Sequence, residues 1–290
     1  MFLKKVSKKI IVITGKSGTL GSFFYNKYKK KYKIISYPYR LEKIKKIDRW
    51  LKDKKFDYFI HFAAITSKIN IDNNNINIVN KIAPIKIINS LNKNNIKNFK
   101  YFLFISSSHV YGFNKNLLSE KSKRNPFNLY GKTKKSVEDY IEQNKKKFKF
   151  KIGIARVFNY TYKTQKRGHF VPDLYNKIKF NSYLDNLNTF RDYIHINDIV
   201  QCLDLMIKKR FSNPLNICSG KKINLINLCK ILNKMSFNKP IKLNISKKEF
   251  NKNIIGSNML LRKLGYKKFK NINYILKSFL HGKKKNIDIR

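Results

Sequence analysis

Cysteine, acidic residues and long apolar runs are all scarce in this chain of 290 residues. The three cysteines, Cys202, Cys218 and Cys229, show no C-x-x-C spacing, which excludes a disulfide framework and a zinc ribbon and fits a reducing compartment. No apolar run approaches the roughly 20 residues that span a bilayer. The N-terminus lacks the apolar stretch of a secretory signal. We therefore expect a cytoplasmic protein with no metal site and no membrane partner.

Acidic residues number 16 against 65 basic ones, which gives a formal net charge of +49. A nucleic-acid-binding surface would gather basic residues on one element and would favour Arg, which pairs bidentately with phosphates and base edges. Here only nine of the basic residues are Arg, and Lys is spread from end to end. We interpret the excess as the codon usage of an AT-rich genome and expect no nucleic-acid partner; a nucleic-acid or membrane-surface role is the alternative. The positive field still attracts polyanions such as diphosphate nucleotides.

Hydrophobic residues make up 42% of the chain, which is enough for a substantial core. Short β-branched runs predict buried strands, and apolar residues three and four apart predict helices. Strands that alternate with helices are typical of a Rossmann-like α/β fold, a doubly wound parallel sheet with helices on both faces. We expect strands at 10–13, 33–37, 58–62, 101–106 and 151–157, and helices that end near 31 and lie at 42–52, 76–93 and 132–144.

A glycine-rich segment follows the first expected strand and opens the first expected helix. It consists of Gly15, Lys16, Ser17, Gly18, Thr19, Leu20 and Gly21. Glycines allow a tight turn there and let backbone N–H groups approach a pyrophosphate at the helix N-terminus. The phosphate-loop motif needs a Gly five residues before its second Gly, and Ile10 occupies that position, so that motif is excluded. We predict that this segment binds a dinucleotide.

The end of the second expected strand indicates which dinucleotide is bound. An acidic residue there would bond the adenosine ribose 2′-hydroxyl, whereas an Arg favours a 2′-phosphate. Residues 36–40 contain no acid and end in Arg40. We therefore predict NADP as the cofactor, with Arg40 on its 2′-phosphate and NAD as the alternative.

Tyr130 and Lys134 are four residues apart near the start of an expected helix, so both side chains can face one site. Tyrosine has a reference pKa near 10, too high for acid–base chemistry at neutral pH. We expect the Lys134 ammonium, with a positive nicotinamide, to lower the pKa of Tyr130 toward neutrality. A run of serines at 106–108 stands at the end of an expected strand, where ligands of parallel sheets bind, and a serine there can hydrogen-bond the reacting oxygen.

Further motifs occur in a fixed order along the chain. They are the glycine turn, 61–64 (HFAA), Asn80, 106–112 (SSSHVYG), the Tyr130/Lys134 pair, 156–159 (RVFN), 191–198 (RDYIHIND) and 216–220 (NICSG). In this order the chain resembles the extended short-chain dehydrogenases/reductases, which are NAD(P)-dependent epimerases, dehydratases and reductases of nucleotide sugars. The resemblance covers nearly the whole chain.

The resemblance implies roles for individual residues. Ser107 stands where the family has its catalytic serine, Tyr130 where it has its acid/base, and Lys134 where it has the ribose-binding residue that lowers the pKa of the tyrosine. The implied cofactor contacts, besides the glycine turn and Arg40, are Ala63, Ala64, Asn80, Tyr130 and Lys134.

The resemblance also implies contacts with a nucleotide-diphosphate sugar. Ser107 and Ser108 would bind the sugar, and Asn159 and Arg191 would hold its diphosphate. A forked guanidinium suits that task. A salt bridge from Arg191 to a neighbouring aspartate is the alternative.

The glycine turn looks like that of dTDP-4-dehydrorhamnose reductases, and the stretch between it and His61 is as short as in reductases. The resemblance therefore implies that a 4-keto-sugar nucleotide is reduced with NADPH. A 4-epimerase that keeps NAD bound is one alternative. His109 and His169 stand where GDP-fucose synthases, which epimerise C3 and C5 before reducing C4, have acid/base residues, so a combined epimerase and reductase is another. A non-catalytic NADP-binding sensor or scaffold is the third.

We expect residues 1–161 to form the dinucleotide-binding domain, with 190–217 returning to it. Residues 162–189 and 218–290 would form a smaller lobe that covers the nucleotide sugar. The resemblance also implies a homodimer through the helices at 76–93 and 132–144.

Overall fold

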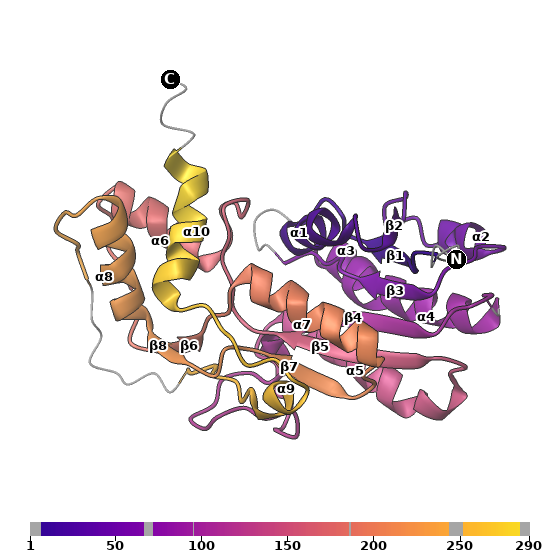
Figure 1. The fold of residues 1–290 in the computed structure, drawn as a ribbon. Helices are drawn as coiled ribbons and strands as arrows, with labels where there is room; N and C mark the ends of the chain where they lie inside the picture. Colours follow the sequence, from indigo (N-terminus) through magenta and orange to yellow (C-terminus); the bar gives the residue numbers. More distant parts are fainter. Residues whose placement is uncertain (1–6, 67–71, 95, 186, 244–251, 285–290) are drawn as a thin grey trace, which may run out of the picture.

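The computed structural model describes residues 7–66, 72–94, 96–185, 187–243 and 252–284, and its centre is a six-stranded parallel sheet (Figure 1). The strand order is β2-β1-β3-β4-β5-β7, so the chain starts inside the sheet and reverses direction beside β1 and β3. This order is typical of doubly wound folds and confirms the predicted fold class. The strands are β1 (Ile10–Thr14), β2 (Lys33–Ser36), β3 (Tyr58–His61), β4 (Tyr101–Ser107), β5 (Lys151–Val157) and β7 (Pro214–Ile217).

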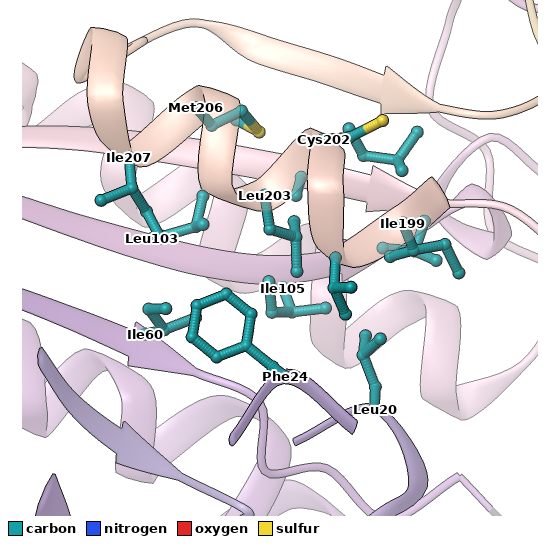
Figure 2. Close-up of a cluster of buried hydrophobic side chains, with 14 of the residues drawn as sticks. Leu20, Phe24, Ile60, Leu103, Ile105, Ile199, Cys202, Leu203, Met206 and Ile207 are labelled. Carbon is teal, nitrogen blue, oxygen red and sulfur yellow. The ribbon is translucent and has the colours of Figure 1, made fainter. Parts of the chain in front are cut away.

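Helices cover both faces of this sheet. On one face, Phe24 of α1 lies among Ile60, Ile105 and Leu203, so that α1 and α7 share one buried cluster with the strands (Figure 2). A second cluster lies on the other face, under α2, α4 and α5. Among the described residues, no helix is both long and apolar enough to cross a membrane. The helices on the sheet are α1 (Thr19–Tyr28), α2 (Lys45–Leu51), α3 (Asn73–Asn77), α4 (Ala83–Lys93), α5 (Leu129–Gln143) and α7 (Ile196–Lys209).

Two of the helices that differ from the sequence expectation bear on the site. The helix expected at 76–93 begins as α3, passes through a π-helical turn at Ile78–Ile82 and continues as α4. Such a turn inserts one residue into the helical repeat, which apolar spacing over so short a stretch does not report. Helix α5 begins three residues earlier than expected, because the Asn128 side chain caps it by accepting from the Gly131 N–H over 2.8 Å. Tyr130 therefore stands in the first turn of α5.

A second group of elements lies beside the sheet. Strands β6 (Phe190–Asp192) and β8 (Lys222–Asn224) pair antiparallel outside the main sheet, whereas α7 and β7 between them in sequence belong to it. Three helices gather beyond this pair around a buried cluster of their own (Figure 1). The boundaries of the two lobes stay a prediction. The helices are α6 (Phe170–Lys179), α8 (Leu225–Ser236) and α10 (Ile272–Lys284), and the short α9 (Met259–Lys263) packs on β7.

Candidate active site

Two adjoining cavities open at the carboxyl end of the sheet, on either side of the turn between β1 and α1. One, of about 830 Å³, lies between this turn and the segment after β2. The other, of about 670 Å³, lies between the turn, the end of β4 and the start of α5. Gly15, Ser17, Gly18 and Ala64 line both. Ligands of doubly wound sheets bind in the crevice where the strand order reverses, which here is between β1 and β3.

At two positions of the glycine turn there is no room for a side chain. Gly15 has a φ of +70°, and a Cβ there would lie 2.6 Å from the Ala63 nitrogen. A Cβ on Gly21 would lie 2.2 Å from the Gly15 carbonyl oxygen. The Gly18 N–H donates to that carbonyl over 3.1 Å, and α1 follows with no acidic residue in its first turn. Backbone groups rather than side chains therefore face the cavities at the N-terminus of this ten-residue helix, which fits a pyrophosphate.

The remaining residues of the turn also lie at the cavities. Ser17, Thr19 and Leu20 line the smaller cavity, and Lys16 lines the larger one. The Lys16 ammonium lies 3.9 Å above the ring of Tyr25. The structure thus brings all seven predicted residues to the crevice.

Buried hydrogen bonds hold the segment after β3 against this turn. Thr14 Oγ1 lies 3.1 Å from His61 Nδ1 and accepts from the Ala63 N–H over 3.3 Å. Asn80, fully buried in the π-helical turn, accepts from the Ile65 N–H over 2.8 Å and donates to the Ile65 carbonyl over 3.0 Å. Ala63 and Ala64, both predicted as cofactor contacts, line the larger cavity. Asn80, the third predicted contact in this region, instead fixes the backbone at Ile65, the residue after Ala64.

Arg40 lies at the rim of the larger cavity. Its side chain is 81% exposed, and its Nη2 lies 2.9 Å from Glu42 Oε1. The hydrogen bond from Arg40 lowers the pKa of Glu42. Glu42 was not among the residues predicted from the sequence, because it stands two residues beyond the window 36–40. The cavity therefore presents both the cation that favours a 2′-phosphate and an acid that can bond a ribose hydroxyl.

Ser107, Tyr130 and Lys134 meet in the smaller cavity. Ser107 ends β4, and its hydroxyl accepts from the His109 N–H over 3.2 Å. Lys134, one turn after Tyr130, is 1% exposed, and its ammonium donates to the Ile105 carbonyl over 2.9 Å. The same ammonium lies 5.9 Å from the centre of the Tyr130 ring. The structure therefore gathers the three predicted catalytic side chains beside the glycine turn.

Burial moves the pKa values of the tyrosine and the lysine in opposite directions. It raises the pKa of Tyr130 to about 12, against the neighbouring Ser107 hydroxyl, which lowers it. It lowers the pKa of Lys134 to about 7, against the Glu138 carboxylate, which raises it. Desolvation of the phenolate is the largest cause of the raised Tyr130 pKa, and the lowering expected from Lys134 together with a bound nicotinamide stays a prediction. Tyr130 therefore carries its proton at neutral pH and is a proton donor.

A buried carboxylate ties the catalytic strand to the catalytic helix. Glu138 of α5 is 1% exposed and accepts from the Ser106 hydroxyl over 2.5 Å and from Arg156 Nη2 over 2.7 Å. Ser106 is thereby bonded to Glu138, and the Ser107 hydroxyl is the one that lowers the pKa of Tyr130. Ser108, also buried, opens the short 3₁₀ turn that follows β4 and lines the cavity.

Both histidines predicted as additional acid/base residues line the same cavity. The His109 ring meets the Tyr130 ring edge to face, with centroids 5.6 Å apart. Asn128 accepts from the Gly131 N–H, so its amide nitrogen faces His109 Nδ1 at 3.0 Å. Because an amide nitrogen only donates, Nδ1 accepts, and the neutral ring carries its proton on Nε2. His169 precedes α6, and burial lowers its pKa.

The two residues predicted to hold a diphosphate differ in their contacts. Asn159 lines the cavity, but its amide donates to the Asp192 carbonyl over 3.1 Å. Arg191 donates through Nη1 to the Thr189 hydroxyl over 2.7 Å. The Asp192 carboxylate accepts from the N–H and the hydroxyl of Ser219, so the described contacts give Arg191 neutral acceptors. A guanidinium whose acceptors are neutral can still form a charge pair with an anionic ligand.

Tyr160 and Gln165, from the segment after β5, also line the smaller cavity and were not predicted. The signal that could have found them is their position just after the RVFN motif at the end of a strand. Within the part of the chain that the structure describes, no group of three or more His, Cys, Asp or Glu side chains is placed to hold a metal ion.

Comparisons with known proteins agree with this geometry. In sequence, the chain is 26% identical over 221 residues to the GDP-6-deoxy-D-talose 4-dehydrogenase of Aggregatibacter actinomycetemcomitans, covering 72% of this chain and 74% of the relative. In structure, it resembles the UDP-glucose 4-epimerase of Thermotoga maritima, solved with UDP-glucose (TM-score 0.83, 19% identity, 96% of this chain and 99% of that chain). It equally resembles RMD from Pseudomonas aeruginosa complexed with NADPH (TM-score 0.83, 19% identity, 96% and 98%). At this identity the two structures show the fold alone.

A family model carries the assignment further. The model described as the NAD dependent epimerase/dehydratase family matches residues 11–218, from β1 through β7. This span contains the glycine turn, the Ser107–Tyr130–Lys134 set and most of both cavities. The chain therefore belongs to the NAD dependent epimerase/dehydratase family of nucleotide-sugar enzymes, as the resemblance predicted.

Proposed function

We propose that this chain reduces the C4 keto group of a nucleotide-linked 4-keto-6-deoxyhexose with NADPH. The observation that carries the proposal is that Ser107, Tyr130 and Lys134 line one cavity beside the glycine turn. Two hydroxyls at the carboxyl end of a parallel sheet are suited to hold a carbonyl oxygen. A phenol that is protonated at neutral pH is suited to give that oxygen a proton.

The two cavities divide the ligands between them. The larger cavity, with Arg40 at its rim, would hold the adenosine end of the dinucleotide. The glycine turn between the cavities would hold the pyrophosphate. The smaller cavity would hold the nicotinamide and the sugar. Arg191, which lines neither of the two cavities, would reach the sugar's diphosphate from outside that lining.

Each catalytic residue has one task in this reaction. Ser107 donates a hydrogen bond to the C4 oxygen and, with Tyr130, fixes its position. NADPH, when bound, supplies the hydride. Tyr130 transfers its proton to the oxygen as negative charge develops there, since an alkoxide is a stronger base than a phenolate. The Lys134 ammonium, one helical turn away, stabilises the phenolate that results.

Two of the comparisons support this choice of reaction. The Aggregatibacter relative is named as a 4-dehydrogenase of GDP-6-deoxy-D-talose, and reduction of a 4-keto sugar is that type of reaction in reverse. RMD was solved with NADPH, which supports NADPH as the donor.

The test is NADPH oxidation by the purified chain with GDP- and dTDP-linked 4-keto-6-deoxyhexoses, followed as the loss of NADPH absorbance. We expect turnover of at least one of them, and a fall in kcat of at least about a hundredfold in Tyr130→Phe, because a general acid is removed. NADPH should still bind to this variant. Tyr140→Phe, on the same helix but outside the cavity lining, is the matched control and should turn over like wild type. Wild-type turnover in Tyr130→Phe would remove Tyr130 from the mechanism.

A 4-epimerase with tightly bound NAD is the second candidate, and Glu42 favours it because an acid at the adenosine ribose suits NAD. An epimerase returns the hydride to the same sugar and so retains its cofactor through purification. Mass spectrometry of the purified chain separates the candidates. Co-purified NAD(H) supports the epimerase, whereas NADP(H) or no dinucleotide supports the reductase.

A further inference from the structure

The catalytic serine belongs to a stretch of chain that leaves the sheet, residues 106–111, which we call the serine segment. Pairing of β4 with β5 ends at Ser107, and the short 3₁₀ turn at Ser108–Val110 follows. Residues 106–109 line the smaller cavity. Because the segment leaves the ladder after Ser107, contacts at its two ends determine where its cavity-lining side chains stand relative to Tyr130.

The first end of the serine segment is bonded to the catalytic helix. The Ser106 hydroxyl donates to Glu138 Oε1 over 2.5 Å. Glu138 stands four residues after Lys134 and eight after Tyr130 on α5, so the three side chains share one face of the helix. The bond therefore fixes the start of the segment relative to the helix that carries Tyr130.

The second end is held through Arg156 of β5, the residue opposite Ser106 in the strand register. Its Nε and Nη2 donate to Glu138 Oε2 over 3.1 and 2.7 Å, and its Nη1 donates to the Tyr111 phenol oxygen over 2.8 Å. The Tyr111 phenol in turn donates to Asn216 Oδ1 of β7 over 2.6 Å. One guanidinium thus connects the carboxylate that holds Ser106 with the residue that ends the segment.

This arrangement is buried and reaches the cavities only through the segment. Glu138 is 1% exposed and Arg156 is 3% exposed, and both lie outside the lining of the two cavities, as does Tyr111. A buried ion pair adds little net stability compared with apolar residues of similar volume. Alignment of catalytic groups, in contrast, has a large effect on the rate of the chemical step.

We infer that Glu138 and Arg156 are positioning residues for catalysis, whose ion pair holds both ends of the serine segment so that Ser107 and Tyr130 address the same carbonyl oxygen. The inference rests on the proposed C4 reduction and adds two residues to its machinery. It assigns the pair an effect on kcat, because neither side chain lines the cavities that receive the sugar and the dinucleotide.

The first test cuts one end of the segment at a time and leaves the ion pair in place. Ser106→Ala removes the bond to Glu138, and Tyr111→Phe removes the bond from Arg156 while keeping the ring. We expect each to lower kcat for the 4-keto-6-deoxyhexose that the wild type reduces by about tenfold or more. KM for the sugar and Kd for NADPH should stay within about twofold of wild type. In the double variant the loss should fall short of the product of the two, because both bonds fix one segment.

The second test separates positioning from stability. Glu138→Leu and Arg156→Met together with Ser106→Ala replace the ion pair by apolar side chains and leave no serine hydroxyl facing them; Arg124 keeps its contacts with Asp139 and Glu142. We expect Tm, measured by circular dichroism, to stay near that of wild type or to rise. We expect kcat to fall by at least about a hundredfold. A role in stability alone predicts the reverse, a lower Tm with wild-type kcat in the folded protein.

Ser136→Ala is the matched control for the serine substitution. Ser136 lies on α5 two residues before Glu138, and its hydroxyl donates to the Lys132 carbonyl within the same helix over 3.0 Å. This variant should keep the wild-type kcat. If the apolar variant does not fold, Ser106→Ala and Tyr111→Phe decide the question, because both keep the buried charges paired.

The outcomes separate this inference from the proposed function. If the wild type reduces the sugar and both Ser106→Ala and Tyr111→Phe keep its kcat, the inference fails and the proposed function stands. If the wild type interconverts 4-epimers instead, the proposed function fails, and the same loss of kcat in epimerisation supports the inference, since Ser107 and Tyr130 serve either reaction. If the wild type catalyses neither reaction, both fail.

Discussion

Burial of Lys134 disfavours the charged form of its side chain. Its ammonium has the Ile105 carbonyl as acceptor, and burial lowers its pKa to about 7 from the ordinary 10.5. Between these two pH values the unfolded chain binds more protons at this residue than the folded chain. Stability therefore rises with pH across this window, and below about pH 7 the fold carries the full cost of a buried charge.

We predict that Lys134→Met is more stable than wild type below pH 7 and that this advantage narrows as the pH rises toward 10.5. The narrowing should amount to a few kcal/mol, since one pKa unit corresponds to about 1.4 kcal/mol. Urea unfolding of both proteins across this range measures it, and the titration of other groups cancels in the difference. Lys132→Met, an exposed lysine on the same helix, is the control and should show no such trend. A difference that does not change with pH would show that Lys134 is well solvated.

Arg40 and Glu42 form the residue pair on which the choice between NADPH and NADH depends. A 2′-phosphate must draw Arg40 away from the carboxylate that it now contacts at 2.9 Å. We predict that Arg40→Ala weakens NADPH binding by about tenfold with little effect on NADH, and that Glu42→Gln strengthens NADPH binding because it frees the guanidinium. Fluorescence titration of both dinucleotides gives the Kd values. An equal loss for NADPH and NADH in Arg40→Ala would count against a 2′-phosphate contact.

At the scale of the element, close contacts between backbone atoms determine how β1, the glycine turn and α1 pack together. Gly21→Ala would place its Cβ 2.2 Å from the Gly15 oxygen, whereas Gly18→Ala would place its Cβ 3.4 Å from the same atom. We predict that Gly21→Ala lowers the free energy of unfolding by about 1–3 kcal/mol, as overpacking does, and that Gly18→Ala leaves it nearly unchanged. Urea unfolding without dinucleotide measures both. Equal stability of the two variants would mean that the turn relaxes around the added methyl group.

This same unit could be predicted from the sequence, because an apolar run, spaced glycines and a helix follow one another locally. The π-helical turn could not, since its Asn80 is held by Ile65, fifteen residues earlier in the chain. The start of α5 depends on the Asn128 cap, which the apolar spacing does not report. The pKa of Tyr130 depends on how completely the fold removes water, and the Tyr–Lys spacing alone says nothing of that.

At the scale of the whole molecule, several of the few carboxylates lie inside the structure and join elements. Glu138 joins α5 to β4 and β5, through Ser106 and Arg156. Asp204 of α7 accepts from Lys31, just after α1, over 2.6 Å and from Tyr32 over 2.6 Å. The net charge of +49 is therefore carried by a surface that has few acids left to balance it. Such a surface repels itself and destabilises the compact state.

Screening of this repulsion should stabilise the fold. Raising NaCl from about 0.01 M to about 0.15 M shortens the Debye length from about 30 Å to about 8 Å, which removes repulsion across the molecule but affects the buried Glu138–Arg156 pair little. We predict that Tm rises over this range, by about 2–4 °C for each kcal/mol of repulsion relieved. Circular dichroism melts measure it, and choline chloride should act like NaCl because screening depends on ionic strength rather than on the cation. A Tm that stays flat or falls would mean that the lysines are too dispersed for their mutual repulsion to weaken the fold.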